Sequence, residues 1–271
     1  MEGTIMVRKL QYLILALSLC LCAGCAINPI TGKEELMLMS EEQDIEIGRK
    51  YAPEVEKQMG GKIDDPALQQ YIDRVGQRIV RVSHSRPFQY HFIALNHNSV
   101  NALALPGGYV YITKGMLKEL TTEAQLASVL GHEVTHIVAR DVSVAMSRQI
   151  GIGLLLSAVT SDKTPSGVLT AANLTQQILD LQYSREDERD ADLGGLDYMV
   201  RAGYNPYAMV ETMQMLQDQQ KTRPVEFFST HPNPENRIAY LMQKIQTNYP
   251  NLQKLRTGKD DYKTNVLNAI K

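Results

Sequence analysis

The sequence has 271 residues, of which 44% are apolar and 21% charged, and its formal net charge is −2 at pH 7. This balance is typical of a globular protein and excludes the strongly basic character expected of a nucleic-acid-binding protein. The three cysteines, Cys20, Cys22 and Cys25, all lie near the amino terminus. The rest of the chain therefore has no disulfide framework and no cysteine-ligated metal site, and any metal there must be bound by His, Asp or Glu.

Residues 1–24 have the pattern of a secretory signal peptide. A basic start precedes the apolar run 13–23, which is shorter than the about 20 helical residues needed to cross a bilayer. Cys25 follows two small residues, as in the lipobox of bacterial lipoproteins, although Cys22 stands where Leu is usual. We expect cleavage before Cys25 and lipidation of its thiol; an ordinary cleaved signal peptide or an uncleaved anchor is the alternative.

The segment 25–39 is predicted to be a tether, and residues 40–271 a single domain. A capping box at Ser40 and Gln43 predicts a helix that ends near Gly60. Pro66 after Asp65 predicts the start of a second helix. Apolar residues recur every three or four positions, which gives each helix one buried face. These residues are Ile45, Ile47, Tyr51 and Val55 in the first helix, and Leu68, Tyr71, Ile72, Val75, Ile79 and Val82 in the second.

Two stretches predict a small β-sheet. Residues 88–95 are typical of a strand, and residues 101–113 of a strand pair interrupted at 106–108, where Pro-Gly-Gly favours a turn. Three histidines lie in or near this region, and none has a partner at the spacing of metal ligands. We therefore expect His84, His91 and His97 to be surface or strand residues.

The remainder of the chain is predicted to be helical. Thr122 and Gln125 suggest a capping box for a helix that runs to Val138. The apolar run 150–159 is too short to span a membrane and favours a core helix or a membrane-touching edge. One helix is expected over 171–201, two more begin near 205–206 and 233–234, and the last twenty or so residues show no pattern. The fold class is α+β, mostly helical, with a small β-sheet.

The strongest chemical signal is the run HEVTH at residues 132–136, within the helix capped at Thr122. His132 and His136 lie four residues apart, so both imidazoles can face one ion. Glu133 is offset by one position, which allows its carboxylate to reach a water on that ion without binding the metal. This pattern predicts one zinc ion and hydrolysis by metal-activated water.

A third protein ligand must come from another element. The Gly and His that extend the metzincin motif are replaced here by Ala139 and Val142, so that branch is excluded. The acid-rich stretch 183–192 offers a carboxylate instead. Glu188 and Asp192 share a helical face, which suits a ligand followed by an acceptor for a histidine N–H. From the residues alone, Asp187 and Glu186 remain alternatives to Glu188.

The chain resembles the zinc metallopeptidase family that includes HtpX, the CAAX prenyl proteases and the mitochondrial peptidase Oma. It is most similar to the soluble periplasmic lipoprotein branch, of which BepA is a member, but without a repeat domain. The resemblance covers residues 25–245. It rests on Cys25 with Asn-Pro-Ile-Thr-Gly at 28–32, Asn101-Ala102 with Leu-Pro-Gly-Gly-Tyr-Val at 105–110, the HEVTH helix, Ser184-Arg185 with Glu188, Ala191 and Asp192, and Thr230-His231-Pro232 with Arg237.

The resemblance implies a gluzincin-type domain whose metal ligands are His132, His136 and Glu188. It makes Glu133 the general base and Asp192 the carboxylate behind the ligands. One departure is visible, because Asp141 stands where many relatives have His.

The same resemblance implies roles for two other regions. Asn101, Ala102 and Leu103 lie in the strand that would pair with an extended substrate. His231 corresponds to a histidine near the metal. It would either donate to the oxyanion or occupy the fourth zinc position in a resting enzyme; a plain turn histidine is the alternative.

The predicted function is a zinc-dependent endopeptidase (EC 3.4.24 type) of the bacterial cell envelope, acting on unfolded or misassembled envelope proteins. We expect a periplasmic location with a lipid anchor at Cys25, in the outer membrane rather than the inner, and no nucleic-acid partner. The alternative is a chaperone or assembly factor for outer-membrane proteins with a structural zinc. An intact Glu133 argues against that alternative, since a structural zinc has no use for this carboxylate.

Overall fold

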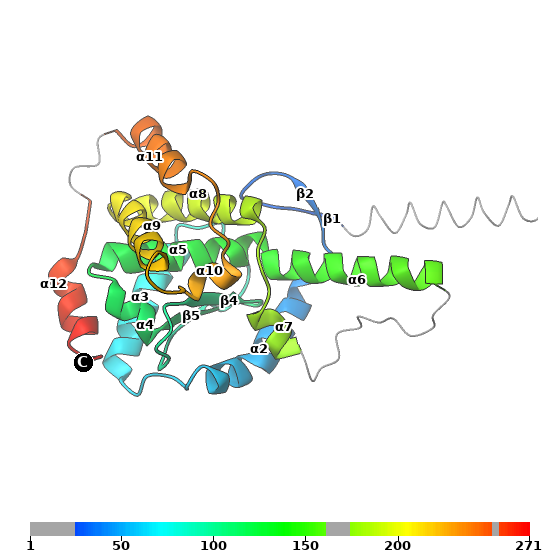
Figure 1. The fold of residues 1–271 in the computed structure, drawn as a ribbon, viewed down its shortest axis with the longest axis horizontal. Coiled ribbons are helices and arrows are strands. Elements are labelled where there is room, and N and C mark those ends of the chain that lie inside the picture. The colour runs from blue at the N-terminus through cyan, green and yellow to red at the C-terminus, as the bar shows by residue number, and fades with distance from the viewer. Residues whose placement is uncertain (1–24, 161–173, 251–254) are drawn as a thin grey trace, which may run out of the picture.

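The computed structural model describes residues 25–160, 174–250 and 255–271 (Figure 1). The predicted signal peptide lies outside these residues. Cys25 begins a two-stranded hairpin, in which β1 (Cys25–Ile27) pairs antiparallel with β2 (Glu34–Leu36). The segment predicted to be a tether therefore contains regular structure of its own.

The main sheet has three strands in the order β3-β5-β4. They are β3 (His91–Leu95), β4 (Ala102–Leu105) and β5 (Tyr109–Thr113). β5 is parallel to β3 and antiparallel to β4. The predicted turn at 106–108 joins β4 to β5, with Gly107 and Gly108 both at positive φ, where glycine carries no steric cost. β4 therefore lies at an edge of this sheet.

Side chains alternate along each strand, so that apolar residues lie on both faces of the sheet. Both faces are covered by helices. One face belongs to the larger core, and the other to a second cluster with helices α2, α6 and α7. Strand residues on the first face are Phe92, Ala94, Ala102, Ala104, Val110 and Ile112, and those on the second are Ile93, Leu95, Leu103, Leu105 and Tyr111.

The helices confirm the mostly helical α+β class (Figure 1). Their bounds are α2 (Glu41–Gln58), α3 (Pro66–Val80), α4 (Lys114–Glu119), α5 (Glu123–Ala139), α6 (Asp141–Thr160), α7 (Leu174–Leu179), α8 (Arg185–Arg201), α9 (Tyr207–Gln220), α10 (Phe227–Thr230), α11 (Arg237–Asn248), α12 (Lys259–Tyr262) and the π-helical η1 (Lys263–Leu267). Among the described residues, no helix is both long and apolar enough to span a bilayer.

The capping predictions are largely confirmed. Ser40 and Gln43 form the full capping box of α2, and Asp65 caps α3 ahead of Pro66. Thr122 caps α5 by accepting from the backbone N–H of Gln125, but the side-chain oxygen of Gln125 accepts from Thr121 and does not complete a capping box with Thr122.

The inner face of α2 differs from the prediction. Ile45 is 40% exposed, whereas Asp44 and Gly48 are buried. Asp44 faces inward because it accepts buried hydrogen bonds from Arg140 and Ser143. Gly48 faces inward because the backbone of Pro106 lies too close for any side chain at this position.

The single helix predicted over 171–201 is wrong for its described part. α7 ends at Leu179, and α8 begins at Arg185 behind a capping box made by Ser184 and Asp187. A Ser followed three residues later by an acid was present in the sequence, and it is the signal for this new helix start.

The carboxyl-terminal segment, for which the sequence predicted no element, contains α12 and η1. Tyr262, Val266 and Ile270 are buried at intervals of four residues, which is a helical stripe within a polar stretch. Arg256 also binds the buried carboxylate of Glu123, in the first turn of α5.

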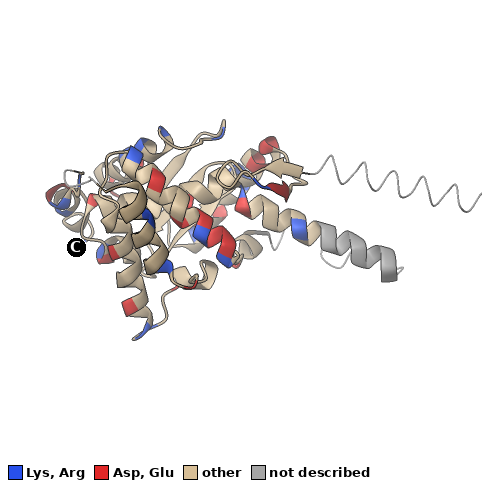
Figure 2. Cartoon of the chain, turned by 90° about the horizontal axis from the view of Figure 1, so that it is seen from above, with Lys and Arg blue, Asp and Glu red and all other residues tan. Residues whose placement is uncertain are grey.

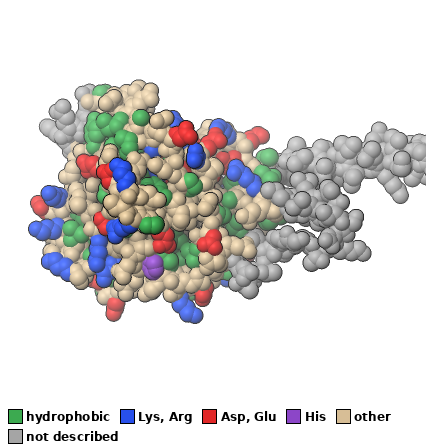
Figure 3. Space-filling model, viewed as in Figure 1, with side chains coloured by type: hydrophobic (Ala, Val, Ile, Leu, Met, Phe, Trp, Pro, Cys, Tyr) green, Lys and Arg blue, Asp and Glu red, His purple; other side chains and the backbone are tan. Residues whose placement is uncertain are grey.

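The surface carries both signs of charge. Lys and Arg alternate with Asp and Glu along the helices (Figure 2), and the face seen in Figure 3 shows the same mixture beside small apolar groups.

Candidate metal centre

The HEVTH run lies at the centre of the molecule. Every residue of α5 is buried, including His132, Glu133 and His136. These polar groups are placed in an apolar interior, where burial without compensating partners is costly. A ligand that satisfies them is therefore expected.

α8 lies beside α5 (Figure 1), and glycines allow the two helices to approach closely. A Cβ on Gly195 would lie 2.8 Å from the backbone nitrogen of His132, and one on Gly131 would lie 3.1 Å from the carbonyl of Gly195. This backbone contact brings the first turns of α8 within reach of the two histidines.

Four side chains converge between these helices and the residue after α10. His132, His136, Glu188 and His231 each offer a ligand atom, and these atoms lie within 4.8 Å of one another. The Nε2 atoms of His132 and His136 are 3.1 Å apart. The oxygens of Glu188 lie 3.5 Å and 3.3 Å from these two nitrogens.

These separations fit zinc. Ligand atoms arranged tetrahedrally at about 2.0–2.1 Å from zinc are about 3.3 Å from one another. The donors, two imidazoles and a carboxylate, are the set found in catalytic zinc sites. The predicted ligands His132, His136 and Glu188 form the metal site, and none of His84, His91 and His97 belongs to it.

The structure selects Glu188 from the three acids that the sequence left open. Asp187 is used in the capping box of α8, and Glu186 pairs with Lys33 at the surface. Glu188 is fully buried. Burial alone would raise its pKa, but the neighbouring His231 and His132 outweigh that effect and hold the pKa well below the usual value.

Each helix histidine gives its other nitrogen to a carboxylate. His132 Nδ1 lies 3.1 Å from Asp192 Oδ1, and His136 Nδ1 lies 2.6 Å from Asp141 Oδ2. Such acceptors fix the tautomer, so that Nε2 is left free for the metal. Asp192 takes the position predicted for it.

Asp192 is itself held by residues of α11. The guanidinium of Arg237 donates to both of its oxygens, at 2.7 Å and 2.6 Å, and Tyr240 donates from its hydroxyl. Although burial would raise the pKa of Asp192, the charge of Arg237 and the bond to His132 lower it. Asp192 therefore stays ionised behind the ligands.

Among the described acids of the site, Glu133 is the one without a hydrogen bond, and its Oε1 lies 3.6 Å from His231 Nε2. It is fully buried, and within the described part of the chain neither of its oxygens has a hydrogen-bond partner. Burial raises the pKa of Glu133 to about 7. A carboxylate whose pKa lies near neutral pH is suited to take a proton and return it.

Aromatic rings stack on two of the imidazoles. The ring centroids of Tyr183 and His136 are 3.9 Å apart, with 10° between the ring planes. Those of Phe227 and His231 are 4.3 Å apart, with 9° between the planes. His231 presents Nδ1 to the cluster, 3.3 Å from His132 Nε2 and 2.8 Å from a Glu188 oxygen. Its Nε2 has no hydrogen-bond partner among the described residues and lies 3.6 Å from Glu133 Oε1.

Sequence reasoning missed several of these supporting residues. Arg237 was recognised only as part of a matching motif, without a role, and Tyr240, Tyr183 and Phe227 were not identified. Tyr240 follows Arg237 by three positions on one helical face, which is a usable signal. The stacking of Tyr183 and Phe227 depends on chain segments far from α5 and leaves no local pattern.

A cavity of about 160 Å³ leads from the sheet edge to His231. Asn101 and Leu103 line it on the side of β4, and Ile178, Leu181 and Tyr183 line it on the opposite side. Of the three residues predicted to bind substrate, Asn101 and Leu103 border this cavity, and Ala102 lies between them, fully buried.

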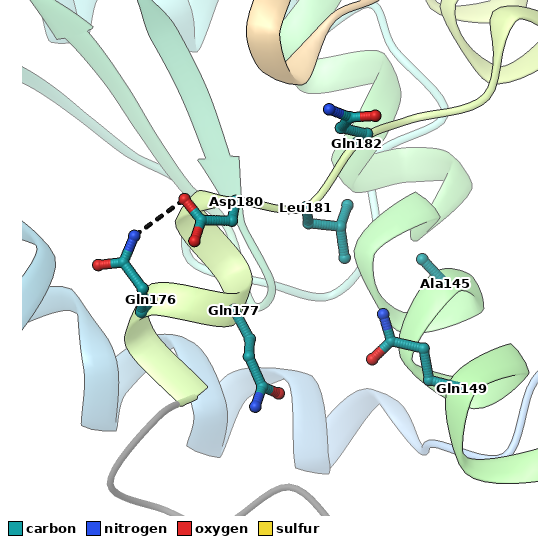
Figure 4. A pocket seen from close by; sticks show the side chains of 7 residues that line it. All are labelled: Ala145, Gln149, Gln176, Gln177, Asp180, Leu181 and Gln182. Atoms are coloured by element: carbon teal, nitrogen blue, oxygen red, sulfur yellow. Dashed lines mark hydrogen bonds between the residues drawn. The ribbon is translucent and has the colours of Figure 1, made fainter. Parts of the chain in front are cut away.

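A larger pocket of about 610 Å³ adjoins this cavity through Gln176, Asp180 and Leu181. Ala145 and Gln149 of α6 face the α7 segment across it (Figure 4). Its lining is dominated by amides, and Gln176 donates to Asp180 at 2.9 Å.

Residues 66–245 match the family model for peptidase family M48. The chain is 31% identical over 225 residues to the beta-barrel assembly-enhancing protease of Escherichia coli K12, an alignment that covers 78% of this chain and 45% of that protein. It is 30% identical over 224 residues to the protein of the same name in Yersinia pestis (78% and 46%). The mitochondrial metalloendopeptidase OMA1 of Schizosaccharomyces pombe is 33% identical over 196 residues (71% and 56%). The chain thus spans about half the length of these curated relatives.

Proposed function

The chain belongs to peptidase family M48, and from that premise we propose that it is a zinc-dependent endopeptidase of the bacterial cell envelope. The observation that carries the proposal is Glu133. Its two oxygens are buried beside the ligands His132, His136 and Glu188, and neither has a hydrogen-bond partner among the described residues. A zinc site that served only for stability would have no need of this carboxylate.

Zinc, when bound, lowers the pKa of a water molecule and polarises the scissile carbonyl. Glu133 removes a proton from the attacking water, whose oxygen forms the new bond to the carbonyl carbon. The C–N bond then breaks, and Glu133 returns the proton to the leaving amine. The products are a carboxylic acid and an amine, and the carboxylate of Glu133 is regenerated.

Substrate binding is assigned to the edge strand β4. An extended peptide would add as a further strand along Asn101, Ala102 and Leu103, and main-chain bonds of this kind do not depend on side-chain identity. The cavity beside these residues reaches His231. This arrangement suits unfolded or misassembled envelope proteins, whose backbone is available for pairing.

His231 is proposed to hold the enzyme in a resting state by occupying the fourth position around the metal. Its Nδ1 lies among the other ligand atoms, which supports this role. In the alternative role, its N–H would donate to the oxyanion, and His231→Ala would then lower the rate. We expect His231→Ala to raise basal proteolysis, and an unchanged or lower rate would refute the resting-state role.

Cys25 is proposed to carry lipid and to anchor the protein to the periplasmic side of the outer membrane. It is exposed and stands at the first position of β1. Metabolic labelling with a fatty acid should label the wild type and not Cys25→Ser. The bacterial relatives are named beta-barrel assembly-enhancing proteases, and these names support a role in the assembly of β-barrel proteins.

The decisive test compares the wild type with Glu133→Gln. Both are purified with equal zinc content and assayed for degradation of an unfolded envelope protein. Gln keeps the shape of the side chain but cannot take a proton at neutral pH, so turnover should fall by about 10²-fold or more. Equal turnover would refute the peptidase proposal.

The second candidate is a chaperone or assembly factor with a structural zinc. One observation favours it, namely that four side chains converge on the site, as in closed structural sites. If Glu133→Gln still restores envelope assembly in cells while its proteolysis is lost, this second activity is present as well.

A further inference from the structure

The carboxylate that contacts His136 comes from a residue whose position in the sequence would not normally allow the contact. Asp141 Oδ2 lies 2.6 Å from His136 Nδ1, and both residues are buried. They are five positions apart. In a continuous α-helix, residues at this spacing differ by about 140° around the axis and about 7.5 Å along it, so their side chains do not meet.

A break between α5 and α6 makes the contact possible. Arg140 has φ 62° and ψ 36°, a left-handed conformation that residues other than glycine seldom adopt. α5 ends at Ala139 before it, and α6 begins at Asp141 after it. The reversal turns Asp141 back toward the last turn of α5, where His136 lies.

Buried polar contacts hold Arg140 in this conformation. Its Nε donates to Asp44 Oδ2 at 2.6 Å, and an Nη donates to the carbonyl of Met39 at 2.8 Å. Ser143 donates to the other oxygen of Asp44 at 2.6 Å. Both Arg140 and Asp44 are buried, so these bonds are shielded from competing water.

We propose that Asp141 is a positioning residue for the zinc ligand His136, and that the Asp44–Arg140 ion pair is the device that aims it. Asp192 does the same for His132, but its charge is neutralised by Arg237. Asp141 differs, since among the described residues His136 is the only basic side chain that pairs with it. The carboxylate of Asp141 thus serves to orient His136 for the metal, and it contributes little to the stability of the metal-free fold.

The inference rests on the zinc site and is independent of proteolysis. A carboxylate accepts the imidazole N–H more strongly than a neutral group does, which makes His136 a better metal ligand.

The test measures zinc affinity and metal-free stability separately in the full mature chain. Asp141→Asn keeps the shape of the side chain and removes its charge, and Asp218→Asn removes an exposed acid on α9 as the matched control. We expect Asp141→Asn to bind zinc about 10–100-fold more weakly, by competition with a chromophoric chelator. Its unfolding midpoint without metal should stay equal to that of the wild type or rise.

Two further variants complete the design. Asp141→His supplies an alternative acceptor and should recover part of the affinity, and it serves as the folded variant if Asp141→Asn is unstable. The double variant Asp44→Asn with Arg140→Gly permits the left-handed conformation but removes the ion pair, and it should also weaken zinc binding. The visible spectrum of the Co²⁺-loaded proteins should shift in Asp141→Asn and not in Asp218→Asn.

Three results would overturn the proposal. Zinc affinity of Asp141→Asn equal to that of the wild type would show that the contact does not position His136. A metal-free stability loss that accounts for the whole loss of affinity would make Asp141 a structural residue. Wild-type affinity in the double variant would remove the role of the Asp44–Arg140 pair.

Discussion

The catalytic base should destabilise the fold that carries it. Glu133 is fully buried, and neither of its oxygens has a hydrogen-bond partner among the described residues, although His231 Nε2 lies 3.6 Å from Oε1. Burial raises its pKa to about 7 in the metal-free chain, from about 4.5 when exposed. The folded state therefore binds more protons than the unfolded state between these two pH values. The free energy of unfolding is therefore highest, as far as Glu133 is concerned, below about pH 4.5, where the side chain is protonated in both states. It falls as the pH rises to about 7, because the side chain then ionises in the unfolded chain while the buried one keeps its proton.

The size of this destabilisation follows from the two pKa values of Glu133. A difference in pKa from about 4.5 to about 7 corresponds to about 3 kcal/mol at pH 8. Glu133→Gln removes the charge without changing the size of the side chain. We therefore expect the metal-free variant to be more stable than the wild type by up to about 3 kcal/mol at pH 8, or about 6–12 °C in Tm. Below about pH 4.5 the two proteins should unfold together.

A second glutamate on the same helix supplies the control. Glu123 is also buried, but it accepts bonds from Tyr71, Tyr204 and Arg256. Although burial raises its pKa, these bonds outweigh that effect and lower it. Glu123→Gln should accordingly destabilise the protein at pH 8 and lose this effect toward acid, the opposite sign to Glu133→Gln.

The assay is thermal or urea unfolding of the chelator-treated proteins between pH 4 and pH 8. If Glu133→Gln is no more stable than the wild type at pH 8, the carboxylate is not buried without partners, and the reasoning fails. It fails equally if the advantage of the variant increases toward acid.

Three further outcomes are expected. Gly195→Ala should cost about 1–3 kcal/mol in unfolding free energy and weaken zinc binding, because its Cβ would press on the backbone of His132. Ser184→Ala removes the cap of α8 and should lower stability by about 1 kcal/mol in urea unfolding, with zinc content retained. Arg237→Met removes the cation that pairs with the buried carboxylate of Asp192 and leaves it only the contacts with Tyr240 and His132, so stability should fall by about 3–5 kcal/mol, with loss of zinc measured by elemental analysis.

The parts of the fold that local patterns encode were predictable. The caps at Ser40, Asp65 and Thr122 each precede an apolar periodicity, and both signals arise within a few residues of one another. The HEVTH run belongs to the same class, since two ligands and the base share one helix. Such signals do not depend on the rest of the chain.

Contacts between distant segments were not predictable in this way. Arg140 reaches Asp44 across nearly a hundred residues, and Asp44 in turn rotates α2 so that Ile45 is exposed. An apolar stripe that includes Ile45 gives the wrong inner face, because a buried ion pair decides the orientation. The stacking of Tyr183 on His136 depends in the same way on where α7 and α8 are placed.

The acid-rich stretch 183–192 shows how far the metal ligand could be predicted from the sequence alone. Five acids in seven residues gave three candidate ligands, and composition could not separate them. The start of α8 does so: once Ser184 caps the helix, Asp187 is committed to the capping box, and Glu188 and Asp192, one turn apart, face α5. Asp187→Ala should therefore reduce stability while zinc content is kept, whereas Glu188→Ala should abolish zinc binding. If Asp187→Ala lost zinc and Glu188→Ala retained it, the capping frame that we derive for α8 would be wrong.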